Sequence, residues 1–184
     1  MLNIGANMKE LKNSFLVFVT PFAPKLSFIK LNQTTHKGVV GVFALLTTTI
    51  IITCVHYFKL RHSEVQIILY ELIAFTLGFG IKIFLLSALV SSLTAKIYHQ
   101  VNLKQNFAIL SLSSLVYTIP AIGLLTTGHS VLVLNIITLF YFGSLIGIGF
   151  SYFYNKRLIY TVLLSIIVLF VAELIIYSFS GMAI

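Results

Sequence analysis

Charged residues are scarce in this chain. Only 9% of its 184 residues are Asp, Glu, Lys or Arg, and aspartate is absent, whereas a soluble domain carries about 25% charged residues. Hydrophobic residues make up 59%. Backbone polar groups inside a bilayer must be satisfied within the protein, which favours helices. The composition therefore excludes an ordinary soluble domain and predicts an all-α bundle within a membrane.

Cysteine and recognisable catalytic patterns are also lacking. Cys54 is the only cysteine, which excludes an internal disulfide and a cysteine-based metal site. The five histidines form no HExxH spacing, and without aspartate there is no Ser-His-Asp triad. A Ser-His-Glu arrangement stays open. We expect no enzymatic activity, no cofactor and no metal site.

Five long apolar runs are present instead. They cover residues 39–58, 65–95, 107–127, 131–153 and 158–180, and about 20 apolar residues suffice for a helix to cross a bilayer. Residues 38–184 are therefore predicted to form a polytopic bundle of five transmembrane helices. The 65–95 run is longer than a bilayer needs, so it must tilt, extend beyond the membrane, or break at Gly78 and Gly80. Pro120 predicts a kink in the third run.

Residues 1–37 form a basic segment before the first run. Its apolar stretch at 15–19 is too short to span a membrane, and Pro21 and Pro24 follow it. We expect short helices on the membrane surface, with Phe15, Phe18, Phe22 and Phe28 at the headgroup level. The lysines expected to contact anionic headgroups are Lys9, Lys12, Lys25, Lys30 and Lys37.

Basic residues are distributed unevenly between the two sides of the predicted bundle. Lys59 and Arg61 lie on one side, and nine basic residues lie on the side of the N-terminus. Because short cytoplasmic loops carry the excess of Lys and Arg, the N-terminus should be cytoplasmic and the C-terminus on the opposite side. The abundance of Lys, Ile and Asn favours a bacterial inner (plasma) membrane. Lysines outnumber arginines ten to two, which argues against nucleic acid as a partner.

Four polar side chains inside the predicted spans form a candidate intramembrane site: Glu71, Lys82, Glu173 and Tyr177. Glu71 and Lys82 are about three helical turns apart and share a face, and Glu173 has nearly the same predicted depth as Glu71. Because a charge in hydrocarbon costs roughly 2.5–3.5 kcal/mol, both glutamates should face the interior of the bundle. Alternatively, Glu71 lies near the outer interface, Lys82 extends toward the inner one, and Glu173 makes an interhelical hydrogen bond.

Small residues predict where helices approach closely. Gly143 and Gly147 form a GxxxG pattern in the fourth run, which allows close contact with another helix. Packing within the bundle is the favoured interpretation and a dimer contact is the alternative. Helix packing is also the expected role of Gly78, Gly80 and Pro120.

Three segments together resemble the YIP (Ypt-interacting protein) family of membrane proteins. They are PFAPKLSFIKL at 21–31, TAKIYHQVNLKQNFAIL at 94–110 and SLVYTIPAIG at 114–123. The resemblance covers roughly residues 20–180 and implies five spans with a cytoplasmic N-terminus. The chain has neither the glycine-rich loop nor the long N-terminal region of eukaryotic members, so it is more similar to short bacterial members. The Rab-type GTPase partners of eukaryotic members are therefore not implied.

These observations predict a non-enzymatic integral membrane protein of YIP type that is an accessory subunit or organiser of a membrane complex. Its expected partners are membrane lipids and either another membrane protein or further copies of itself. The alternative is a small transporter or channel subunit that uses Glu71, Lys82 and Glu173.

Overall fold

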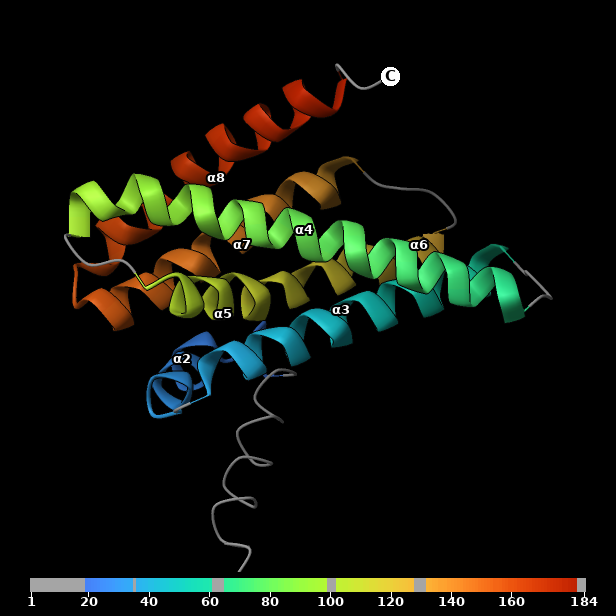
Figure 1. Cartoon of the computed structure of the whole chain (residues 1–184), viewed down its shortest axis with the longest axis horizontal. Helices are drawn as coiled ribbons and strands as arrows, with labels where there is room; N and C mark the ends of the chain where they lie inside the picture. Colours follow the sequence, from blue (N-terminus) through green and yellow to red (C-terminus); the bar gives the residue numbers. More distant parts are fainter. Residues whose placement is uncertain (1–18, 35, 61–64, 99–101, 128–131, 182–184) are drawn as a thin grey trace, which may run out of the picture.

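The computed structural model describes residues 19–34, 36–60, 65–98, 102–127 and 132–181 (Figure 1). Every regular element in these ranges is helical, which confirms the predicted all-α class. The elements are α2 (Pro24–Asn32), α3 (Lys37–Leu60), α4 (Val65–Tyr98), α5 (Leu103–Ser113), the 3₁₀ helix η2 (Ser114–Tyr117), α6 (Thr118–Thr127), α7 (Leu132–Tyr154) and α8 (Leu158–Gly181).

Four segments of the described chain are long and apolar enough to cross a membrane. They are Lys37–Val55, Leu72–Ser92, Leu103–Gly123 and Ile136–Tyr154, and they correspond to the first four predicted runs. The apolar stretch assigned in α8, Leu158–Ala172, is shorter. The structure thus supports a membrane protein with four candidate spans, and the fifth span stays a prediction.

The helix α5 lies at the centre of the bundle. It contacts α3, α4 and α7, and the whole stretch 108–116, which continues into η2, is buried. Small side chains make this central position possible, because neighbouring helices can approach closely only where little volume intervenes. At Gly41 of α3, for example, an added Cβ would lie 3.0 Å from the Ala108 Cα.

The third span is interrupted just before Pro120. The four residues of η2 separate α5 from α6. Proline has no N–H, and its ring crowds the carbonyl four residues earlier, here that of Val116, so the α-helical hydrogen bond cannot form. The preceding turn tightens to 3₁₀ geometry instead, and the Thr118 hydroxyl donates to the Leu115 carbonyl at 2.7 Å. The kink predicted from the sequence thus takes the form of a tightened turn.

The long helix α4 is continuous, so the break considered at Gly78 and Gly80 does not occur. Its 34 residues correspond to about 50 Å, well beyond a ~30 Å hydrocarbon core. One glycine weakens a helix by only about 1 kcal/mol, and packing along α4 outweighs that cost. At Gly80 an added Cβ would lie 3.3 Å from Leu45 of α3, so this glycine brings α3 and α4 together.

The helix α2 packs into the bundle more deeply than the sequence predicts. Phe28 is fully buried, and an added Cβ at Gly149 of α7 would lie 3.2 Å from its ring. The Tyr141 hydroxyl of α7 also donates to the Pro21 carbonyl. Phe28 therefore occupies a space that Gly149 leaves in the protein, rather than the headgroup region. Phe22 remains 85% exposed.

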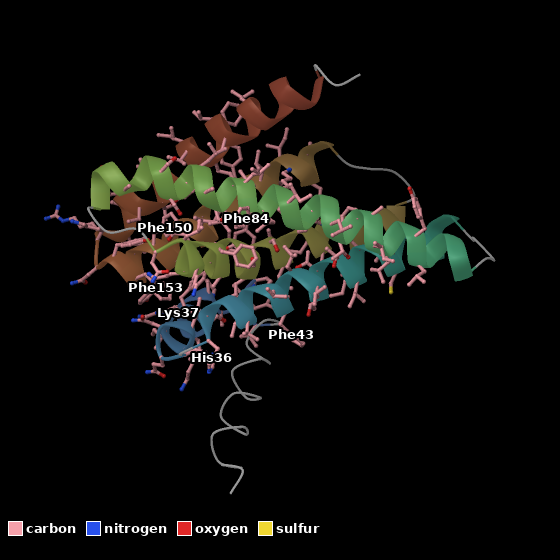
Figure 2. The ribbon with its side chains drawn as sticks, in the orientation of Figure 1. His36, Lys37, Phe43, Phe84, Phe150 and Phe153 are labelled. Atoms are coloured by element: carbon pink, nitrogen blue, oxygen red, sulfur yellow. The ribbon has the colours of Figure 1, made fainter. Side chains whose placement is uncertain are left out.

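One end of the bundle gathers basic side chains. The helices α3, α5 and α8 begin there, and α4 and α7 end there (Figure 1). We call it the basic end, and its basic residues with described side chains are Lys25, Lys30, Lys37, Lys104, Lys156 and Arg157. Nitrogen-tipped side chains are visible there around His36 and Lys37 (Figure 2).

Candidate functional site

A groove opens between α3 and α4 at the level of Lys82. This lysine lies ten residues from each end of the candidate span Leu72–Ser92, near the middle of the membrane, and its side chain is half-buried. The groove has a volume of about 530 Å³, and its other lining residues are Ile52, Ala74, Phe75, Gly78, Phe79 and Tyr117. A charged group at this depth is costly in lipid, and the groove gives it a protein surface instead.

Aromatic rings form the floor of this groove and connect it to the core. The rings of Phe75 and Phe79 stack with centroids 5.7 Å apart, and Phe79 meets Tyr117 edge-on at 6.0 Å. Tyr117 in turn lies 5.0 Å from Phe142 of α7, which is fully buried. Such pairs are worth about 0.5–1.5 kcal/mol beyond their buried area, so the floor is expected to be rigid.

Small residues form the α4 rim of the groove. Ala74 and Gly78 are four residues apart and lie on one face of the helix. A Cβ added at Gly78 would meet nothing within 4 Å, so its close-approach surface is open. Lys82 follows one turn later on the same face. This pattern suits contact with a further helix.

The glycines of the GxxxG pattern are in a different situation, because α8 already covers them. A Cβ at Gly143 would lie 3.0 Å from Ile166, and a Cβ at Gly147 would lie 2.4 Å from the Val162 Cα. Their close-approach surface is occupied by α8 of this chain.

The other members of the predicted intramembrane site cannot be placed around Lys82. The side chains of Glu71, Glu173 and Tyr177 lie outside the described residues, although their backbones belong to α4 and α8. The second half of α8 diverges from the beginning of α4 (Figure 1). A polar pocket shared by the two glutamates therefore stays a prediction.

The five predicted headgroup lysines differ in their surroundings. Lys25 and Lys30 of α2 are exposed, whereas Lys9 and Lys12 lie outside the described residues. The Lys37 ammonium lies 5.0 Å from the centroid of the Phe153 ring, and the two residues are close together in Figure 2. This cation–π contact joins the beginning of α3 to the end of α7.

A buried hydrogen-bond network at the basic end was missed by the sequence reasoning. Asn106 is fully buried, and its Nδ2 donates to Ser91 Oγ of α4 at 2.7 Å. The Tyr154 hydroxyl of α7 donates to Asn106 Oδ1, also at 2.7 Å. One amide thus links three helices. In the sequence, Asn106 lies in the polar stretch between the second and third apolar runs, and its position directly before the third run is the available signal.

The described residues contain no group of three His, Cys, Asp or Glu side chains that could hold a metal ion. Cys54 is exposed on the bundle. Most buried hydroxyls are used locally. For example, Thr48 Oγ1 donates to the Ala44 carbonyl one turn earlier.

No protein-family model, curated protein or solved structure matches this chain. Two features of the structure therefore bear on function: the lateral groove at Lys82 and the basic end.

Proposed function

We propose that the protein is a non-enzymatic integral membrane protein that serves as an accessory subunit in a membrane complex. Its lateral groove, beside Lys82, binds a transmembrane helix of another protein. The proposal also includes the YIP-type assignment, the five-span topology, the cytoplasmic N-terminus and the bacterial inner membrane.

The observation that carries the proposal is the contrast between two sets of small residues. Gly143 and Gly147 are covered by α8, whereas Gly78 is open and lies beside a lysine at mid-membrane depth. The lining is otherwise apolar and aromatic, which suits helix packing.

The packed centre of the bundle favours a subunit over a channel. The buried core includes Phe142, Phe150 and Leu145, and the groove at Lys82 opens sideways between two helices. A conduction path would instead need polar groups lining a continuous route through the bundle.

Site-specific photocrosslinking in native membranes tests the proposal. A benzoylphenylalanine at Ala74 should give one discrete adduct with another membrane protein. The same probe at Ile73 should not, because Ile73 is exposed but lies about 100° around α4 from Ala74. Gly78→Leu should remove the adduct while the chain still folds, since its side chain enters open space.

Two controls make the outcome decisive. Ile73→Phe enlarges an exposed side chain on another face of α4 and should leave the adduct intact. An adduct with a second copy of this chain would contradict a heterologous partner. Transport of a solute by the purified chain in proteoliposomes, lost in Lys82→Gln, would favour the transporter alternative instead.

A further inference from the structure

A second groove lies at the basic end, between the beginnings of α3 and α5. It has a volume of about 760 Å³, and its polar wall includes His36, Lys37, Asn102 and Lys104. These residues come from two separate parts of the chain that the fold brings together, α3 with the residue before it and α5 with its N-cap. The groove is distinct from the one at Lys82, which lies between α3 and α4.

The positive charge of this groove favours an anion. Lys37 and Lys104 both line this hollow. The contact of Lys37 with Phe153 positions its ammonium at the basic end, as Figure 2 shows. The helix α3 begins at Lys37, and the partial positive charge of a helix N-terminus adds to the attraction.

The groove also has an apolar part, which continues along α3. Val39, Val42 and Phe107 line it, and Val39 and Val42 are 67% and 49% exposed. Phe43, Leu46 and Ile50 extend the same exposed face of α3. From Val39 to Ile50 this face covers about 16 Å, roughly one leaflet of a ~30 Å hydrocarbon core.

We propose that this groove binds an anionic phospholipid, with the headgroup phosphate at Lys37 and Lys104 and an acyl chain along Val39 to Ile50. A cationic pocket beside the exposed apolar face from Val39 to Ile50, here called the track, fits an amphipathic anion. Free phosphate fits less well, because it has no apolar part that could contact the track. The side-chain amide nitrogen of Asn102, which is in the lining, can donate hydrogen bonds to phosphate oxygens. This inference does not depend on the partner helix proposed above.

Lipid titration of the purified full chain, followed by native mass spectrometry, tests the proposal. We expect phosphatidylglycerol to bind at least tenfold more tightly than phosphatidylcholine with the same acyl chains. Lys104→Gln should reduce phosphatidylglycerol affinity about fivefold, the factor that one basic residue near an anionic lipid contributes, and leave phosphatidylcholine binding unchanged. Lys104 is exposed, so this variant should fold normally.

Matched controls separate a built site from general attraction of charge. Lys156→Gln removes an exposed lysine from the same end but outside the groove, and should change affinity less than twofold. Val42→Asn keeps every charge and should weaken long-chain phosphatidylglycerol about threefold by making the track polar. The proposal is overturned by equal losses in Lys104→Gln and Lys156→Gln, or by equal binding of both lipids. Competition by inorganic phosphate at concentrations comparable to the lipid would also overturn it, by showing a free-phosphate site.

Discussion

A single buried amide, Asn106, holds three helices together at the basic end. Its hydrogen bonds to Ser91 and Tyr154 cross from α5 to α4 and α7. Interhelical hydrogen bonds in membrane proteins are worth about 0.6 kcal/mol on average and up to about 1.7.

We expect Tyr154→Phe to lower the free energy of unfolding by about 0.5–1 kcal/mol and Asn106→Leu by about 1–2 kcal/mol, measured by circular dichroism during SDS titration in mixed micelles. In the double variant the loss should be smaller than the sum, because both changes remove the same bond. Ser92→Ala, next to Ser91 but exposed, provides the control and should change stability by less than about 0.5 kcal/mol. An additive double variant would show that Tyr154 and Asn106 act independently.

At the same scale, Asn106 and Phe28 show what the sequence could not supply. Both residues owe their burial to partners far along the chain. Tyr154 is 48 residues from Asn106, and Gly149, which makes room for Phe28, is 121 residues away from it. Hydropathy assigns an amide to a loop and a phenylalanine among lysines to an interface, because it evaluates each residue against its neighbours in sequence. The position of Lys82 along the second span could be predicted, because it follows from counting residues along an apolar run.

At the scale of helices, two glycines of similar sequence context are expected to respond oppositely to the same change. Gly147→Ala places a Cβ 2.4 Å from the Val162 Cα, which is backbone and cannot yield locally, whereas Gly78→Ala places it in open space. Overpacking costs about 1–3 kcal/mol, and replacing an unhindered helical glycine by alanine gains up to about 1 kcal/mol. Gly147→Ala should therefore lower the thermal midpoint in detergent, and Gly78→Ala should leave it unchanged or raise it. Equal losses in both variants would mean that α8 does not pack on Gly147 as described.

The bounds of α3 to α7 were predicted to within a few residues because an apolar run long enough to span a bilayer is a strong signal. The continuity of α4 was not, because local propensity does not report the packing along its length.

At the scale of the whole molecule, large apolar side chains cover much of the surface of the described bundle as well as filling its core, and α8 shows this most clearly. Its described exposed positions are mainly large and apolar, including Leu163, Ile167 and Phe170, while Thr161 and Ser165 are buried against the bundle. A helix lying on the membrane surface would present a charged face to water, so this pattern favours α8 as a fifth span.

A fifth span in α8 predicts that positions 156 and 184 lie on opposite sides of the membrane. In a Cys54→Ala background, Lys156→Cys should be protected from a membrane-impermeant maleimide added outside intact cells, and Ile184→Cys should react with it. Lys104→Cys serves as the internal control and should behave like Lys156→Cys, because both lie at the basic end. Protection of both 156 and 184 would reduce the bundle to four spans, and labelling of 104 and 156 but not 184 would reverse its orientation in the membrane.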